Sequence, residues 1–211
     1  MNETLLIKIL NILFLLFVPF VMIGIIKKTK AFFGARYGAS IFQPFYDFIK
    51  LMKKRSIYST STTWLFRIAP VVGLACVLFA CLFIPIISGK SIISIEGGLI
   101  IFAYALGLSK FLSILASMET ASSFEGMGCS REACFTTIIE PAFFIVIASI
   151  MAVCKIYTFE SLTNVISQSG AIGYLIIIFA ILALGIMLLM EGCRVPVDDP
   201  ATHLELTMIH E

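Results

Sequence analysis

Long runs of apolar residues separated by polar stretches dominate the pattern of this 211-residue chain. A helix that crosses the hydrocarbon core of a bilayer needs about 20 consecutive, mostly apolar residues. Runs of this length predict five spanning helices, at residues 5–26, 65–87, 97–118, 135–154 and 171–190. These runs do not alternate as the strands of a membrane barrel do. We therefore expect an all-α integral membrane protein that forms a single transmembrane domain over residues 1–211.

Composition agrees with the hydrophobic pattern, since 60% of the residues are hydrophobic and 13% are charged. Soluble domains average about 45–50% apolar and about 25% charged residues. The net charge is only +2, and the lysines stand beside the predicted spans, so nucleic-acid binding is not supported. The six cysteines show no C-x-x-C spacing and the two histidines lack a second flanking motif. We therefore expect no metal site and no cofactor bound by this chain alone.

The distribution of basic residues predicts the orientation in the membrane. Connection 27–64 carries eight of them: Lys27, Lys28, Lys30, Arg36, Lys50, Lys53, Lys54 and Arg55. The segments that follow the third and fifth spans carry Arg131 and Arg194. Because Lys and Arg concentrate in cytoplasmic loops, residues 27–64, 119–134 and 191–211 are predicted to be cytoplasmic. The chain would then be a multi-pass protein of the cell inner (plasma) membrane with its N-terminus outside.

The connection 27–64 contains an expected amphipathic helix within residues 42–54. Phe45, Phe48, Ile49 and Met52 fall on one helical face, and Pro44 suits a first helical position. Such a helix would lie on the cytoplasmic surface of the membrane. Two interpretations remain open: a lipid anchor, or the border of a lateral opening into the protein.

Two ionisable residues fall within the predicted spans. Glu140 lies about 8 Å into the fourth span at 1.5 Å per residue, and Lys110 lies past the middle of the third. A charge at the centre of a spanning helix costs about 2.5–3.5 kcal/mol on insertion scales. Pro141 should loosen the helix and leave a carbonyl that water can satisfy. Glu140 therefore either locks two helices together or takes part in proton passage.

Polar residues also gather at the predicted cytoplasmic ends of the last three spans. The set comprises Glu119, Glu125, Arg131, Glu132, Glu191, Arg194, Asp198, Asp199 and Glu205. These residues form either an ordinary solvated surface or a polar lid that supplies a path from water to Glu140. As a physical hypothesis, the lid is a relay of carboxyl groups whose proton affinities are separated by burial and by neighbouring charges.

Two segments carry a resemblance to a known family. Connection 27–64 resembles the signature G-x-x-R-x-G…Q-P…D…K-L through Gly34, Arg36, Gly38, Gln43, Pro44, Asp47 and Lys50. The end of the chain resembles E-x-x-R-x-P-x-D-x-P…E-L through Glu191, Arg194, Pro196, Asp198, Pro200, Glu205 and Leu206. With the nine-residue spacing of Arg131 and Glu140, the chain resembles the first membrane subunit of respiratory complex I. It is more similar to the counterpart of that subunit in membrane-bound [NiFe] hydrogenases of the formate hydrogenlyase and energy-converting type (group 4).

The resemblance implies a non-catalytic subunit that anchors an oxidoreductase complex and couples electron transfer in a cytoplasmic arm to H⁺ or Na⁺ movement. Expected partners are the large and small hydrogenase subunits, an iron–sulfur subunit and antiporter-like membrane subunits, with the [NiFe] centre and iron–sulfur clusters held by the partners. Expected ion-coupling residues are Glu140, Glu119, Glu191, Asp198, Asp199, Glu205 and Lys110. Expected residues for docking at the cytoplasmic face are Arg36, Gln43, Asp47, Arg131 and Arg194.

Departures from the family pattern refine these expectations. Ala201, Thr202 and His203 stand where the complex I subunit carries further carboxylates, which argues against quinone binding. Relatives have further spans, so we expect the chain to be cut at its C-terminal end. Two other functions remain alternatives: the quinone-site subunit 1 of an NADH-quinone oxidoreductase, and a secondary transporter with Glu140 and Lys110 in its substrate site.

Overall fold

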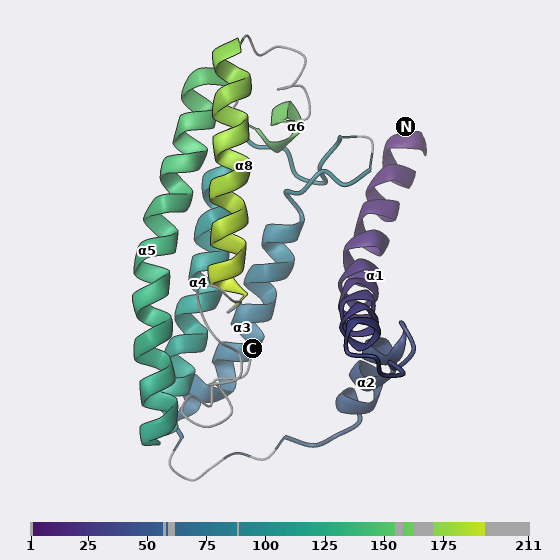
Figure 1. Cartoon of the computed structure of the whole chain (residues 1–211), viewed down its shortest axis with the longest axis vertical. Helices are drawn as coiled ribbons and strands as arrows, with labels where there is room; N and C mark the ends of the chain where they lie inside the picture. The colour runs from purple at the N-terminus through teal and green to yellow at the C-terminus, as the bar shows by residue number, and fades with distance from the viewer. Residues whose placement is uncertain are drawn as a thin grey trace. The chain divides into compact units, whose positions relative to one another are not determined.

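Every regular element in the described part of the computed structural model is a helix (Figure 1), which confirms the all-α prediction. The structure describes residues 2–56, 58, 62–87, 89–154, 158–162 and 171–192. The helices are α1 (Asn2–Phe33), α2 (Gln43–Met52), α3 (Trp64–Cys81), α4 (Gly98–Met118), α5 (Ser123–Cys154), α6 (Phe159–Leu162) and α8 (Ala171–Glu191). Within these residues, five helices are long and apolar enough to cross a membrane: α1, α3, α4, α5 and α8.

Three helix boundaries differ from the sequence prediction by more than one helical turn. Helix α1 continues to Phe33, beyond the predicted end at residue 26. Helix α3 ends at Cys81 rather than at residue 87, because Pro85 disfavours the helical conformation of the residue before it. Helix α5 begins at Ser123, so most of the connection predicted over residues 119–134 is helical. Gly126 and Gly128 were typical of a loop, but Glu125 in the first turn of α5 favours a helix N-terminus.

The first compact unit comprises residues 1–58 and 85–92, and a buried asparagine joins its two segments. Asn11, in α1, is 0% exposed. Its Nδ2 donates to the carbonyl oxygen of Lys90 at 3.0 Å, and its Oδ1 accepts from the backbone nitrogen of Ile87 at 2.8 Å. Both halves of the side-chain amide are therefore satisfied by one connecting segment, which the asparagine fastens to α1.

We expect Asn11→Leu to lower the free energy of unfolding by about 2–4 kcal/mol, because it removes two hydrogen bonds and leaves two backbone groups without their partner. Leucine is more favourable than a polar residue in a spanning helix, so poor insertion would not explain the loss. Denaturant unfolding of the purified protein in detergent measures the effect. Ile12→Leu, at an exposed position of α1, is the control. Equal stability of Asn11→Leu and the wild type would contradict the role of this contact.

Helix α2 packs its aromatic residues against α1. The ring of Phe45 lies 5.9 Å from that of Phe17 and 5.7 Å from that of Phe20, and the ring of Phe48 lies 5.2 Å from that of Phe20. Gly24 permits a close approach of the intervening segment, since a Cβ atom there would lie 1.9 Å from the carbonyl oxygen of Ile41. The predicted amphipathic helix is confirmed, and part of its apolar face is used for packing on α1.

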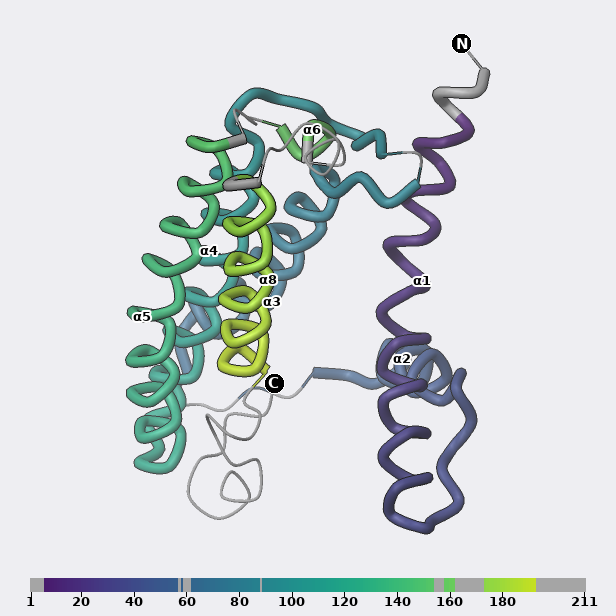
Figure 2. The backbone as a smooth tube through the Cα atoms, turned by 45° about the horizontal axis from the view of Figure 1, so that its top comes forward, coloured from purple at the N-terminus to yellow at the C-terminus, as the bar shows by residue number. Residues whose placement is uncertain are grey.

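The second compact unit comprises residues 59–84 and 93–211. In its described part, α3 packs on α4, α4 on α5, and α5 on α8 (Figure 2). Small residues let α3 approach α4: Ala69, Gly73 and Ala80 are buried, and Ser109 donates a hydrogen bond to the carbonyl oxygen of Gly73 at 3.2 Å. Close packing through small residues and interhelical hydrogen bonds is typical of membrane helices. It fixes the rotation of α4 against its neighbours.

Candidate functional site

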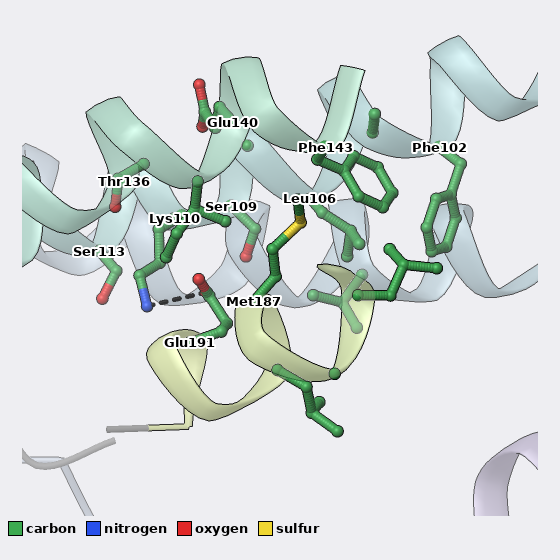
Figure 3. Close-up of a pocket in the computed structure, with 17 residues that line it drawn as sticks. Phe102, Leu106, Ser109, Lys110, Ser113, Thr136, Glu140, Phe143, Met187 and Glu191 are labelled. Atoms are coloured by element: carbon green, nitrogen blue, oxygen red, sulfur yellow. Dashed lines mark ion pairs between the residues drawn. The ribbon is translucent and has the colours of Figure 1, made fainter. Parts of the chain in front are cut away.

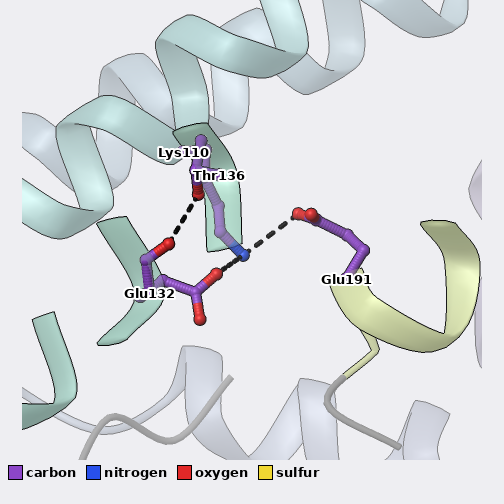
Figure 4. A network of polar contacts seen from close by, with 4 residues as sticks. All are labelled: Lys110, Glu132, Thr136 and Glu191. Atoms are coloured by element: carbon purple, nitrogen blue, oxygen red, sulfur yellow. Dashed lines mark hydrogen bonds and ion pairs between the residues drawn. The ribbon is translucent and has the colours of Figure 1, made fainter. Parts of the chain in front are cut away.

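A cluster of three charged side chains, Lys110, Glu132 and Glu191, links three helices of the second unit. The Nζ atom of Lys110 on α4 lies 2.5 Å from Oε1 of Glu132 on α5 and 3.0 Å from Oε1 of Glu191 on α8 (Figure 4). The side chains of Lys110 and Glu132 are only 15% and 12% exposed, whereas that of Glu191 is 48% exposed. One ammonium group and two carboxylates give this Lys110 cluster a formal charge of −1.

The Lys110 cluster lies at one level of the helix bundle. At 1.5 Å per residue, α5 extends about 33 Å from Glu132 to Cys154, and α8 extends about 30 Å over its whole length. Both lengths are close to the hydrocarbon thickness of a bilayer, about 30 Å. The ion pairs with Lys110 hold Glu132 and Glu191 at one level of the bundle.

A polar stripe on α5 leads from this cluster toward Glu140. Glu132, Thr136 and Glu140 follow one another at intervals of four residues, which places them on one helical face. The hydroxyl of Thr136 donates to the backbone carbonyl oxygen of Glu132 at 2.9 Å (Figure 4). Along the helix axis, Glu140 lies about 12 Å from Glu132.

Glu140 faces α4 at a glycine. A Cβ atom on Gly107 would lie 2.9 Å from Oε1 of Glu140, so the carboxyl group occupies the space that any other residue at position 107 would fill. Among the described residues, Glu140 makes no hydrogen bond and no ion pair. Glu140 is exposed in this structure, and its depth in a spanning helix, where ionisable residues are costly, makes it a functional candidate.

A cavity of about 790 Å³ is lined by Lys110 and Glu191 of the Lys110 cluster and also by Glu140. Lys110, Ser113 and Glu191 line one end, whereas Phe102 and Phe143 line the other (Figure 3). Glu140 borders the same cavity and also a second one of about 540 Å³. Water that enters the larger cavity can reach the carboxyl group of Glu140 beside an apolar wall. The same water can reach the Lys110 cluster.

Pro141 does not interrupt α5, which is continuous from Ser123 to Cys154. Proline nonetheless lacks the N–H group that would bind the carbonyl oxygen four residues earlier, here that of Thr137. Thr137 lines the second cavity, as Glu140 does. The predicted loosening of the helix at Pro141 is therefore limited to the carbonyl group of Thr137, which lies beside the cavity.

The structure gives Glu119 partners on another helix. Its carboxylate accepts hydrogen bonds from the Thr63 hydroxyl and from the backbone nitrogen of Phe66, the latter at 3.0 Å. Both donors stand at the N-terminus of α3, where the helix dipole favours a negative charge. This geometry supports a structural role for Glu119 in capping α3. Its expected participation in ion coupling stays a prediction.

Arg131 and Glu140 lie on the same helix but not on the same face. Nine residues of an α-helix correspond to two and a half turns and about 13 Å, so the two side chains leave α5 in opposite directions. The expected docking role of Arg131 stays a prediction. The other predicted members of the lid, Arg194, Asp198, Asp199 and Glu205, lie outside the described residues.

The predicted docking residues of the first unit stand in and around α2. Arg36 is exposed and follows the Schellman-type end of α1, where its backbone nitrogen donates to the carbonyl oxygen of Ala31 at 2.9 Å. The left-handed residue of this turn is Ala35, with φ 50°. The side chains of Gln43 and Asp47 bind each other, Nε2 to Oδ1 at 3.0 Å.

Sequence reasoning did not select two residues that the structure makes prominent, Gly107 and Asn11. It placed Glu132 in the polar lid without identifying its pairing with Lys110. Glu132 precedes Glu140 by eight residues, and this spacing on one helix would have pointed to it had residues 119–134 been recognised as helical. Gly107 precedes Lys110 by one helical turn on the same face. Asn11 was a polar residue in an apolar run, which alone marks a residue that needs a partner.

The sequence matches the family described as NADH dehydrogenase over residues 7–209. Hydrogenase-4 component C of Escherichia coli (strain K12) is 28% identical over 87% of this chain and 58% of that protein. Formate hydrogenlyase subunit 4 of the same organism is 29% identical over 56% of this chain and 38% of that protein. The chain therefore spans less than two thirds of the length of these relatives.

A solved structure of the membrane-bound sulfane sulfur reductase, an archaeal respiratory membrane complex, shares the fold. Its TM-score is 0.74 with 22% sequence identity, over 89% of this chain and 62% of that chain. Together with the five candidate spans among the described residues, these similarities identify a multi-pass membrane protein.

Proposed function

Because the chain belongs to the NADH dehydrogenase family, we propose that it is the membrane-anchoring and ion-coupling subunit of a multi-subunit membrane-bound [NiFe] hydrogenase. In this role it links electron transfer in a cytoplasmic arm to the translocation of H⁺ or Na⁺. The names of the two Escherichia coli relatives, hydrogenase-4 component C and formate hydrogenlyase subunit 4, support the hydrogenase branch.

The observation that carries the coupling role is the position of Glu140 on a polar stripe that begins at the Lys110 cluster. A carboxyl group that only locked two helices together would be expected to have a partner on the helix it faces. Glu140 instead meets Gly107 and borders two cavities. A group that must bind and release an ion needs this kind of access. Glu140 is then kept in the spanning helix for its function, despite an insertion cost of about 2.5–3.5 kcal/mol.

The charge cluster supplies a means of coupling. If a redox step in the arm moved the Lys110 ammonium away from one of its carboxylates, the electrostatic potential along the polar stripe would change. The coupling is electrostatic and needs no cofactor within this chain.

The remaining parts of the proposal concern orientation and partners. The N-terminus lies outside the cell inner membrane, and the Lys110 cluster lies at the cytoplasmic boundary, next to the redox arm. The large and small hydrogenase subunits and an iron–sulfur subunit dock at the cytoplasmic face, and antiporter-like subunits continue the membrane arm. The docking residues are Arg36, Gln43, Asp47, Arg131 and Arg194. The [NiFe] centre and the iron–sulfur clusters belong to the docked subunits.

A second candidate function is that of a quinone-site subunit in an NADH-quinone oxidoreductase. One observation favours it: the apolar end of the larger cavity, between Phe102 and Phe143, has a lining suited to an aromatic ligand. The sequence argues against it through Ala201, Thr202 and His203. Inhibition of electron transfer by quinone analogues would support this second function.

Copurification tests the proposed complex. The chain, tagged in its native host, should copurify from detergent-solubilised membranes with nickel and iron in near-stoichiometric amounts and with H₂-dependent viologen reduction. An unrelated tagged membrane protein of the same host is the control. A flavin-containing NADH-oxidising module in place of nickel would contradict the hydrogenase branch and favour the quinone-linked alternative.

A further inference from the structure

The larger cavity is charged at one end and apolar at the other. Its volume is about 790 Å³, and its lining comes from α3, α4, α5 and α8. At the charged end, the Lys110 ammonium lies 3.0 Å from the Glu191 carboxylate. At the opposite end the lining is aromatic and aliphatic, with Phe102, Phe143 and Leu184 (Figure 3). A cavity of this size and this division of polarity fits an amphiphilic ligand.

The long direction of the cavity follows the spanning helices. Lys110 and Phe102 are eight residues apart on α4, which corresponds to about 12 Å along the helix axis. Glu191 and Leu184 are seven residues apart on α8, or about 10 Å. Glu191 is the last residue of α8, so the charged end lies where this spanning helix ends and the apolar end lies within the span. A membrane lipid has the same direction, with its headgroup outside the hydrocarbon core and its acyl chains inside.

The charged end of the cavity favours one kind of headgroup. The three side chains of the Lys110 cluster carry a formal charge of −1, and Glu191, which lines the cavity, is 48% exposed. A headgroup with a net negative charge would be repelled by this cluster. A headgroup with an ammonium group would instead donate charge-assisted hydrogen bonds to the Glu191 carboxylate. Ser113, at the same end, has a hydroxyl that can donate to a phosphate oxygen (Figure 3).

We propose that this cavity binds a phospholipid with an ethanolamine headgroup. The ammonium group lies at Glu191, and one acyl chain extends between Phe102 and Phe143. In the described part of the chain, α8 packs mainly on α5, so the acyl chain adds apolar contacts between α8 and α4. The site goes beyond the proposed function and does not depend on it. The second cavity at Glu140 is left open to water.

Native mass spectrometry of the full chain tests the headgroup preference. The purified protein is titrated in detergent with dioleoyl phosphatidylethanolamine or with dioleoyl phosphatidylglycerol, and the apparent Kd of the first bound lipid is measured. We expect the ethanolamine lipid to bind about 10- to 100-fold more tightly, the range that one hydrogen bond to a charged group allows. Equal affinity for the two lipids would overturn the proposal.

Glu191→Gln tests the charged end. Glutamine keeps the shape of the side chain but removes the negative charge, so the variant should bind the ethanolamine lipid about tenfold less tightly and lose the preference for it. Glu96→Gln is the matched control, because Glu96 is exposed and is not among the residues that line the cavity. An unchanged preference in Glu191→Gln would exclude Glu191 as the headgroup ligand and contradict the site.

Gly185→Leu tests the apolar end. Gly185 lines the cavity, and a Cβ atom added there meets nothing within 4 Å. Leucine is also a better helix former than glycine, so the variant should fold while its side chain fills space that the acyl chain needs. We expect both lipids to bind about tenfold less tightly, the effect of a moderate steric overlap. Leu182→Phe, at an exposed position of α8 that does not line the cavity, should bind as the wild type does.

Two results with Gly185→Leu would contradict the proposal. Wild-type affinity for both lipids would place the bound lipid outside the cavity. A short-chain quinone that binds to the wild type but not to Gly185→Leu, without any lipid binding, would assign the cavity to a quinone and support the quinone-linked alternative.

Discussion

Lys110→Met is expected to lower the free energy of unfolding by about 3 kcal/mol and to reduce the amount of the chain in the membrane. Removal of one member of a buried ion pair typically costs about 3–5 kcal/mol, because the other charge stays buried without compensation. Lys110 and Glu132 are both largely buried, whereas Glu191 is half exposed and can be solvated. The lower end of that range is therefore appropriate.

Denaturant unfolding in detergent and quantitative immunoblots of membranes measure the effect of Lys110→Met. Glu132→Gln in the same background should recover part of the loss, because it removes the carboxylate that Lys110→Met leaves buried. The double-mutant cycle isolates the interaction of the pair. Lys8→Met is the matched control, since Lys8 also belongs to a spanning helix but is exposed, and it should change stability by less than about 0.5 kcal/mol. A stable Lys110→Met variant would show that the cluster does not hold the three helices together.

Glu140→Gln carries the second large expected effect, this time on function rather than on stability. Glutamine has nearly the same shape and fits the same space beside Gly107, but it cannot bind or release a proton. Removal of an ionisable group from a spanning helix also lowers its insertion cost. We therefore expect normal assembly and normal electron transfer, with ion uptake lowered by at least about tenfold.

The spanning helices were predictable because the length of an apolar run is a local property of the sequence. The runs that became α4 and α8 ended within one residue of the observed helices at each end. The amphipathic α2 was equally local, since the spacing of Phe45 and Phe48 is visible in the sequence. The start of α5 was not predictable from local sequence. Gly126 and Gly128 weaken a helix locally, but tertiary packing can override this preference. Gly128 is buried.

The partners of the polar residues were less predictable than the residues themselves. Lys110 was identified as a charge that needs a partner, but its pairing with Glu132 and Glu191 depends on how α4 rotates against α5 and α8. Asn11 binds backbone groups 76 and 79 residues away, a distance over which no local pattern applies. Glu119 was grouped with the coupling carboxylates because of its position near a span end, and its contacts with Thr63 and Phe66 required the packing of α3 on α4.

Glu140 illustrates both what the sequence predicts and what only the structure can show. Its depth in a predicted span was enough to single it out, and the depth argument did not need a structure. Its contact with Gly107 and its position between two cavities depend on the register of α4 against α5. A change of that register by one residue would turn Gly107 away from Glu140, since each residue of a helix rotates the side-chain direction by about 100°.

The central claim is that Glu140 couples the redox arm to ion movement, and the most direct measurement is ion uptake by inverted vesicles that contain the complex with Glu140→Gln. We predict vesicles with unchanged subunit content and unchanged H₂-linked electron transfer, but with uptake of the coupling ion at or near the level obtained without an electron donor. Wild-type ion uptake per H₂ in these vesicles would contradict the account.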